Sequence, residues 1–277
     1  MRPHIADPSL KGKLRRRLSR LIHRRRANVR LDRPLVSICF DDAPASAAEA
    51  GDAVLKSRGV RGTYYICAGM TGHDGPMGPN ASVAQIRRLL TEGHEIGCHT
   101  LSHLDCGDAS TEWIDEEVTK NGWKLAEMGA PAPVSFAYPY GDVSPRAKRI
   151  LGERFALSRG LHHGLITNGV DLNQAPAVGI EGPGGEATAA RWLDRALRRR
   201  AWLILYTHDV SDAPTDWGCT PASLGRLVDR ALEGGAEIVP VREGCRRIGA
   251  LGGNPQPRGW PTAGSLSGTA GARYARG

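Results

Sequence analysis

Two carboxylates and two imidazoles are the residues of this chain whose types and spacing could do chemistry. His99 and His103 stand four residues apart, so both imidazoles could reach one ion if the segment turns as a helix does. Asp41 and Asp42 are adjacent, and adjacent carboxylates repel each other unless a cation lies beside them. A divalent ion held by one carboxylate and both imidazoles would relieve that repulsion and leave positions for water and substrate. The second carboxylate could then take a proton from the water.

Each of these patterns also has a plain structural interpretation. On the Asp pair alone, the commoner arrangement is that Asp42 caps the following helix while Asp41 is solvated. A His pair at this spacing, taken alone, is a weak indication of a metal site. His208 follows an apolar run, where a histidine is often only a hydrogen-bonded residue at the rim of a sheet. Tyr140, in a Tyr-Pro-Tyr-Gly stretch, is of a type that more often serves packing.

The segments that must position these residues alternate between predicted strands and predicted helices. Apolar runs predict strands at 35–40, 62–66, 95–98, 134–138, 155–157, 177–180, 202–206 and 237–241. Amphipathic segments predict helices over 46–58, 82–92, 111–128, from 144 onward, near 187–200 and over 221–233. This alternation predicts an α/β fold with parallel strands, and the length favours a single-domain (β/α) barrel of seven or eight strands. In such barrels the chemistry lies at the C-terminal ends of the strands, where the polar groups fall here.

The positive charge of the chain is concentrated at its N-terminus. The whole chain carries +8, yet residues 1–33 contain 12 Lys and Arg against two Asp, so the remainder is net acidic. Apolar residues recur there at helical spacing among the arginines: Leu10, Leu14, Leu18, Leu21 and Ile22. The pattern is typical of a basic amphipathic helix on an anionic membrane surface, and a solvated basic leader explains it equally well. Nucleic acid is the least favoured partner, because the rest of the chain has neither a basic surplus nor a binding motif.

The remaining sequence divides into a body and a tail. We expect residues 34–250 to form the folded domain and residues 251–277, rich in Gly and Pro, to form a disordered tail. No secretion signal or membrane-spanning run is visible, so we expect a cytoplasmic protein. Residues 10–30 would then make peripheral contact with the inner face of the membrane. The six cysteines form no C-x-x-C pair and are expected to be reduced.

The motifs of this chain, in their order, resemble those of the polysaccharide deacetylase family, whose catalytic part is the NodB-homology domain of carbohydrate esterase family 4. The resemblance covers roughly residues 34–245, and its first two motifs together are highly specific. It rests on the stretches 40–42, 99–103, 138–141 and 205–208, with a further likeness at 93–97.

The resemblance implies a distorted (β/α) barrel that binds one divalent metal ion, usually zinc. Three residues would bind the ion: Asp42, His99 and His103. Asp41 would be the general base that activates the attacking water, and His208 the general acid that protonates the leaving amine. The backbone N–H of Tyr140 would help to hold the oxyanion that develops.

The reaction that this resemblance implies is removal of an N-acyl group, acetyl above all, from an aminosugar. A lipid-linked or nucleotide-linked sugar, or a precursor of a surface polysaccharide or glycolipid, fits the basic arm. Two alternatives remain open. One is a deformylase or another amide hydrolase of the same mechanism, and the other is a non-catalytic carbohydrate-binding relative.

Three positions depart from the family pattern or invite a role beyond it. Ala137 stands where the family often has an Arg that orients the base, so something else must position Asp41. Ala43 replaces a usual Gly after the Asp pair, and we expect a tighter pocket there. His162 and His163 are interpreted as exposed loop residues rather than substrate contacts.

Two further departures concern the neighbours of the site histidines. Cys98 replaces a usual Asn beside His99, and a thiolate ligand there is disfavoured because adjacent side chains in a strand point apart. No clear motif supplies the acid that would tune His208. Asp171 is the nearest candidate and a weak one.

Overall fold

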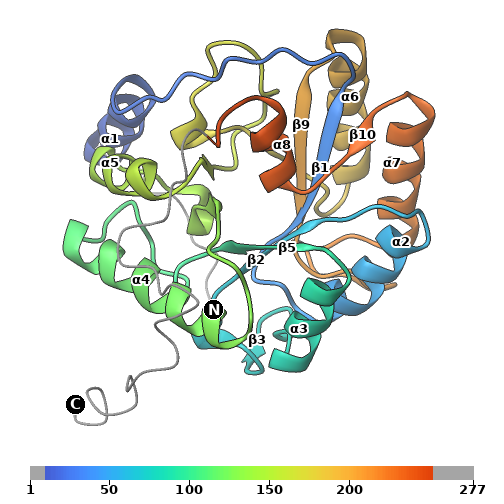
Figure 1. Ribbon diagram of the computed structural model, residues 1–277, viewed down its shortest axis with the longest axis horizontal. Helices are drawn as coiled ribbons and strands as arrows, with labels where there is room; N and C mark the ends of the chain where they lie inside the picture. Colours follow the sequence, from blue (N-terminus) through green and yellow to red (C-terminus); the bar gives the residue numbers. More distant parts are fainter. Residues whose placement is uncertain (1–9, 252–277) are drawn as a thin grey trace.

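A curled sheet of parallel strands forms the centre of the protein, and helices cover its outer side (Figure 1). The computed structural model describes residues 10–251, so the tail predicted at 251–277 lies almost wholly outside the described residues. The strands of the sheet are β1 (Leu35–Phe40), β2 (Thr63–Ile66), β5 (Glu95–Cys98), β6 (Ser135–Ala137), β7 (Leu157–Arg159), β8 (Val178–Gly179), β9 (Trp202–Thr207) and β10 (Glu237–Ile238). Their order is β7-β6-β5-β2-β1-β9-β8, with β10 also pairing with β1, and every pairing is parallel. The predicted distorted (β/α) barrel is confirmed, and a single bridge between Arg159 and Ala175 spans its open side.

Helices and short turns connect these strands. The helices are α1 (Leu10–Leu21), α2 (Asp52–Lys56), α3 (Val83–Thr91), α4 (Thr111–Glu127), α5 (Pro145–Arg154), α6 (Gly185–Arg199), α7 (Pro221–Glu233) and α8 (Val241–Arg247). Four of them begin after a hydroxyl side chain that accepts an N–H of the first turn: Ser82, Ser110, Ser144 and Thr220. The short turns are η1 (Ala47–Gly51), η2 (Ala68–Met70), η3 (Pro139–Gly141) and η4 (Leu172–Gln174). No helix within residues 10–251 is long and apolar enough to cross a bilayer.

Most predicted elements are present, and the differences have local causes. The strand predicted at 155–157 lies at Leu157–Arg159, because its last residue is a buried arginine that apolar periodicity does not indicate. The helix predicted over 46–58 opens as the π-helical turn η1 before α2. The hairpin of β3 (Asp74–Gly75) and β4 (Gly78–Pro79) was not predicted, since it has no apolar run.

A buried polar network closes the N-terminal end of the barrel. Glu95 accepts hydrogen bonds from the hydroxyls of Thr63 (2.9 Å) and Ser135 (2.8 Å) and from the backbone N–H of Arg242 (2.6 Å). Burial raises the pKa of Glu95. The carboxyl group thus joins the starts of β2, β5 and β6 to α8, and the opposite end of the barrel is left for the site.

The segment between α1 and β1 is tied to the body of the protein. The backbone of Ala27 donates to Val170 O (2.7 Å) and accepts from Gly169 N (2.9 Å). The guanidinium of Arg25 donates to the backbone carbonyls of Phe155 (2.7 Å) and Ala156 (2.5 Å). These contacts hold the N-terminal arm against the open side of the barrel.

Candidate active site

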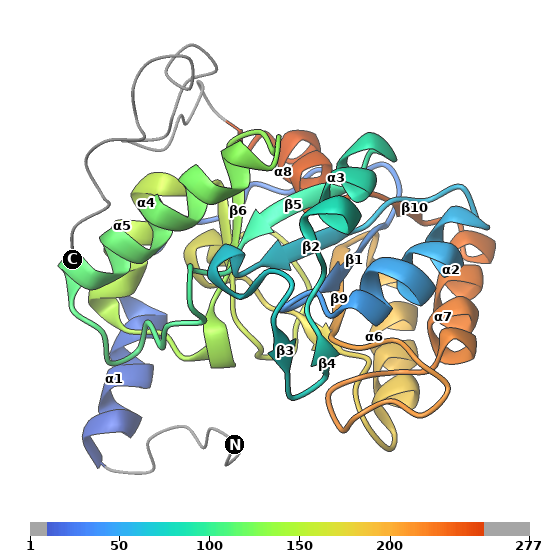
Figure 2. The same ribbon diagram turned by 90° about the horizontal axis from the view of Figure 1, so that it is seen from below.

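The predicted site residues meet at the C-terminal edge of the sheet. Asp41 and Asp42 follow β1. His99 directly follows β5, which is separated from β1 in the sheet by β2. Tyr140 lies in η3 after β6, and His208 follows β9, which pairs with β1. Figure 2 shows these strands from the side, with the β3–β4 hairpin on the edge where they end.

One carboxylate oxygen faces both imidazoles. Asp42 Oδ1 lies 3.6 Å from His99 Nε2 and 3.5 Å from His103 Nε2. Ligand atoms about 2.0 Å from a tetrahedral zinc lie about 3.3 Å from one another, close to these separations. Each imidazole nitrogen therefore lies about as far from this carboxylate oxygen as two ligands of a single ion would lie from each other.

His99 is held in the tautomer that a metal ligand needs. Its Nδ1 lies 2.8 Å from the backbone oxygen of Ala137, which can only accept, so Nδ1 carries the hydrogen. Nε2 is then left with its lone pair toward Asp42. Burial, together with the nearby charge of His103, lowers the pKa of His99 to about 4. The ring is neutral at neutral pH, the form that binds metals.

The loop that carries the two histidines is braced by one carboxylate of α4. Glu117 accepts hydrogen bonds from the backbone N–H groups of Leu101 and Ser102, each at 2.9 Å, and from the Ser102 hydroxyl at 3.0 Å. Thr100 and His103 both have left-handed backbones, with φ of 63° and 62°. Such strain persists where surrounding contacts enforce it, and Glu117 supplies them.

The cysteine that lies beside the candidate ligands is Cys67 and not Cys98, which stands next to His99 in the sequence. Cys98 is buried and accepts from Asn121 Nδ2 (3.2 Å), and burial raises its pKa to about 11. Cys67 Sγ lies 3.8 Å from Asp42 Oδ1, and ligand atoms of Asp42, Cys67 and His99 all fall within 4.8 Å of one another. Sequence analysis missed Cys67, which follows β2 without any polar motif around it.

Asp41 is paired with an arginine from an unexpected strand. Arg159, at the end of β7, donates to Asp41 Oδ1, and both side chains are buried. Burial alone would raise the pKa of Asp41, but the guanidinium charge outweighs it and lowers that pKa. The guanidinium carbon also lies 4.9 Å and 5.0 Å from the ring centres of Tyr65 and Tyr206, a cation–π arrangement on both sides.

This arginine replaces the one that the family often has at Ala137. Ala137 and Arg159 are directly opposite in the parallel pairing of β6 and β7, so their side chains leave the same face of the sheet. The guanidinium therefore reaches Asp41 from the neighbouring strand. Extending the predicted strand by two residues would have found it, because a charged residue at a strand end points to the site.

The candidate general acid, His208, has an acidic partner that no sequence motif indicates. His208 Nδ1 lies 2.8 Å from Glu181 Oε1 and 3.2 Å from Trp217 O. Burial lowers the pKa of His208, but the bond to Glu181 and the carboxylates of the Asp pair raise it overall to about 9. The weak candidate Asp171 was wrong, because it forms an ion pair with the buried Lys148.

Tyr140 stands at the open rim of the site. Its backbone is left-handed, with φ of 58°, and its ring meets the ring of His103 edge to face, with centroids 4.4 Å apart. The side chain is 41% exposed. Its proposed backbone role in holding an oxyanion stays a prediction.

A second cluster of acidic and histidine side chains among residues 10–251 has a structural role instead of a catalytic one. His94 Nδ1 accepts from the N–H of Gly62 (3.1 Å), so its hydrogen is on Nε2, which donates to Asp52 (2.9 Å). Asp52 also pairs with Arg88 (2.8 Å). With Glu92 these groups could gather around an ion, but their hydrogen bonds already join α2, α3 and β5.

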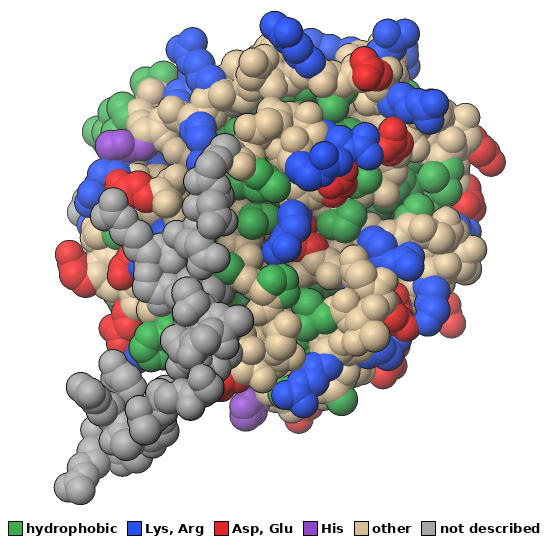
Figure 3. Space-filling model, viewed as in Figure 1, with side chains coloured by type: hydrophobic (Ala, Val, Ile, Leu, Met, Phe, Trp, Pro, Cys, Tyr) green, Lys and Arg blue, Asp and Glu red, His purple; other side chains and the backbone are tan. Residues whose placement is uncertain are grey.

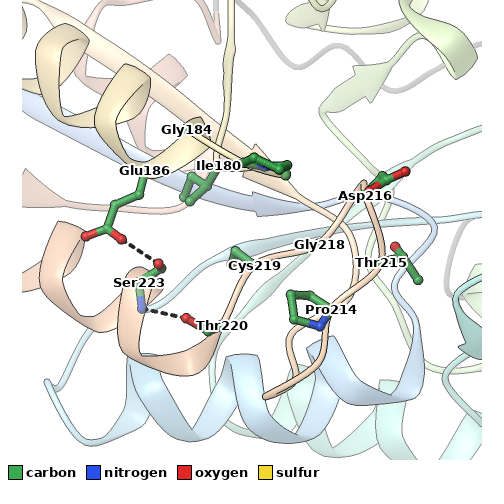
Figure 4. Close-up of a pocket in the computed structure, with 12 residues that line it drawn as sticks. Ile180, Gly184, Glu186, Pro214, Thr215, Asp216, Gly218, Cys219, Thr220 and Ser223 are labelled. Carbon is green, nitrogen blue, oxygen red and sulfur yellow. Dashed lines mark hydrogen bonds between the residues drawn. The ribbon is translucent and has the colours of Figure 1, made fainter.

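A cleft of about 370 Å³ lies to one side of the site, between the start of α6 and the loop before α7 (Figure 4). On its wall the Ser223 hydroxyl donates to Glu186 (2.5 Å), and the Ser223 N–H donates to Thr220 (3.1 Å). The lining runs through Gly182 and Gly218, next to the partners of His208, but includes none of the predicted site residues. The cleft borders the site without containing it.

Comparison with known proteins identifies the class of this parallel barrel. Residues 28–153 match the polysaccharide deacetylase family. The chain is 25% identical over 122 residues to a peptidoglycan-N-acetylglucosamine deacetylase of Listeria monocytogenes, covering 42% of this chain and 24% of that protein. It is 29% identical over 137 residues to a chitin deacetylase of Pestalotiopsis sp., covering 49% and 41%. The chain thus matches less than half the length of these curated relatives.

Solved structures show the same fold. The Xyl-CE4 domain of a multidomain xylanase from the hindgut metagenome of Trinervitermes trinervoides aligns with a TM-score of 0.55 and 16% identity, covering 81% of this chain and 94% of that one. A family 4 acetyl xylan esterase from Clostridium thermocellum, in complex with a cobalt ion, gives 0.53 and 21%, covering 76% and 89%. Residues 28–153 of this chain are thus similar to a polysaccharide deacetylase domain, and the resemblance recognised from its motifs is confirmed.

Transferring the arginine from position 159 to position 137 tests whether its guanidinium group orients Asp41. Arg159→Ala should lower kcat about 100-fold, because the base loses the group that orients it and keeps it ionised. The double variant Arg159→Ala with Ala137→Arg should recover much of that loss, since the two positions face each other in the sheet. Circular dichroism would confirm folding. Full activity in Arg159→Ala would contradict the assignment.

Removing the carboxylate beside His208 should shift the pH profile. Glu181→Gln takes away a group that raises the pKa of His208, so this pKa should fall below about 9. An acid that must be protonated loses activity as pH rises through its pKa, so the alkaline limb of kcat/KM should move to lower pH. Glu243→Gln on α8, which removes only a pairing with Arg246 and Arg247, is the matched control. An unmoved alkaline limb in Glu181→Gln would show that His208 is not the titrating acid.

The residue after the Asp pair offers a stability test. Ala43 is buried and left-handed, with φ of 43°, a region that costs a residue with a Cβ about 1 kcal/mol. Ala43→Gly relieves this strain but removes a buried methyl group and adds entropy to the unfolded chain, so the free energy of unfolding should fall by less than about 1 kcal/mol. Ala126→Gly inside α4 should lower it by about 1 kcal/mol. Urea denaturation measures both, and a larger loss of stability in Ala43→Gly than in Ala126→Gly would refute the strain argument.

Proposed function

We propose that this chain is a metal-dependent hydrolase that removes an N-acyl group, acetyl first of all, from an aminosugar of a polysaccharide or glycolipid precursor. The observation that carries the proposal is the convergence of Asp42, His99 and His103 beside the buried, ionised Asp41. The similar proteins named above, a peptidoglycan-N-acetylglucosamine deacetylase and a chitin deacetylase, support the substrate class.

The donor set fits one divalent ion, with zinc as the expected metal. One carboxylate oxygen and two imidazole nitrogens are a common catalytic ligand set, and the tautomer of His99 suits it. Cys67 Sγ also lies close to this donor set, 3.8 Å from Asp42 Oδ1. When bound, such an ion polarises a carbonyl group and makes a water molecule more acidic.

The residues around the ligand set divide the proton transfers between them. Asp41, oriented and kept ionised by Arg159, accepts the proton of the water that attacks the acyl carbon. His208, kept protonated by Glu181, gives a proton to the departing nitrogen. The backbone N–H of Tyr140 would donate to the oxyanion. An amine leaves readily only after it has gained a proton. A protonated His208 is therefore useful for hydrolysis of an amide, whereas mere binding of a sugar would not need it.

The two alternatives are less well supported. A carbohydrate-binding relative has no need of a base held ionised near an acid held protonated, and both are present here. A deformylase would use the same residues, so only the product distinguishes it. The relatives named for N-acetylglucosamine and chitin favour the acetyl group.

A substrate screen with a ligand variant tests the proposal. Zinc-loaded protein is incubated with N-acetylated and N-formylated aminosugars and glycans, and acetate and formate are measured. Activity should fall about 1,000-fold or more in His99→Ala, because the ion loses a ligand. Bound zinc should fall below one per chain in the same variant, by elemental analysis. The exposed His23→Ala serves as control. Activity that persists in His99→Ala, or after complete chelation, would refute the proposal.

A further inference from the structure

The first helix turns its apolar face to solvent instead of to the core. Leu10 is 85% exposed and Leu21 is 70% exposed. The leucines between them on the same face of the helix are exposed too. The exposed row consists of Leu10, Leu14, Leu18, Leu21 and Ile22. An amphipathic helix on a globular domain normally buries this stripe, so the orientation of α1 is unusual.

Polar contacts fix α1 in this orientation. Arg15 pairs with Asp142 (2.6 Å) and with Asp108, and the Ser19 hydroxyl donates to Val143 O (2.8 Å). Ser19 is fully buried, so this side of α1 is the one that faces the body. The helix cannot bury its leucines against α5 without breaking these contacts.

The surroundings of the leucine row are basic. Several exposed arginines lie on α1 and just after it: Arg17, Arg20, Arg24 and Arg26. A hollow of about 450 Å³ next to the helix is lined in part by Arg20, Arg24, His162 and His163. Figure 3 shows hydrophobic and basic side chains side by side at the edge of the molecule that α1 occupies, whereas over the centre of this face basic and acidic side chains are mixed.

We propose that α1 docks the protein onto an anionic lipid bilayer, with the leucine row inserted among the acyl chains and the arginines at the headgroups. An apolar stripe flanked by arginines matches both layers of such a surface. Figure 2 shows α1 on the same side as the β3–β4 hairpin, where the strands end at the candidate active site. Docking would therefore bring the site toward the bilayer, where it would meet a lipid-linked aminosugar. This substrate class rests on the proposed function, but the docking does not.

Vesicle binding tests the docking without any turnover. The full chain should sediment with vesicles of phosphatidylcholine and phosphatidylglycerol, and much less with phosphatidylcholine alone or in high salt. The double variant Leu14→Ser with Leu18→Ser should bind the anionic vesicles at least about tenfold more weakly, because it loses apolar contact with the acyl chains. Leu232→Ser, an exposed leucine on α7, should bind normally.

A fluorophore on the row reports insertion directly. All six cysteines are buried, so Leu14→Cys provides an accessible thiol for an environment-sensitive dye. Its emission should rise and shift to the blue with anionic vesicles, while the dye on Leu232→Cys should not change. Failure of the wild-type chain to bind, or equal binding by the serine variant, would overturn the proposal. So would dimerisation in sedimentation velocity that depends on the leucine row while the vesicles stay free, which would assign this face to a second copy.

Discussion

The buried ion pair between Asp41 and Arg159 is the interaction on which the site depends. A carboxylate buried at the end of a strand stays ionised only if a cationic partner lies beside it. Arg159 supplies that partner for Asp41, and Asp42 is thereby left to face the two imidazoles. Removing one member of such a pair leaves an unpaired buried charge and commonly costs about 3–5 kcal/mol. The same contact therefore supports the stability of the barrel and the state of the proposed base.

Three titratable groups at the site are set to different charge states by their surroundings. Arg159 keeps Asp41 ionised, burial keeps His99 neutral, and Glu181 helps to keep His208 protonated. A base, a metal ligand and an acid need these three states in turn. The presence of these three charge states in one small site distinguishes this site from the hydrogen-bonded cluster around His94, whose members mainly join secondary-structure elements.

Local patterns were enough to predict most elements and the main candidate residues. Apolar runs located the strands and period-3.6 hydrophobicity the helices, and Asp42, His99 and His103 stood in short motifs. The partners of the site were harder to predict, because Arg159 on β7 and Glu181 just after β8 lie far along the chain from Asp41. Cys67 was not predicted either, because nothing beside it in the sequence marks it as close to Asp42.

The sequence by itself determined the alternation of elements, the placement of acids and histidines at strand ends, and the amphipathic pattern of α1. These features depend on the periodicity of neighbouring residues, which a linear pattern contains in full. Only the tertiary structure decided that β7 carries the arginine for Asp41, that Glu181 is the partner of His208, and that α1 turns its leucines outward. Each of these depends on the register of paired strands or on contacts between distant segments, which are fixed by packing of the whole chain.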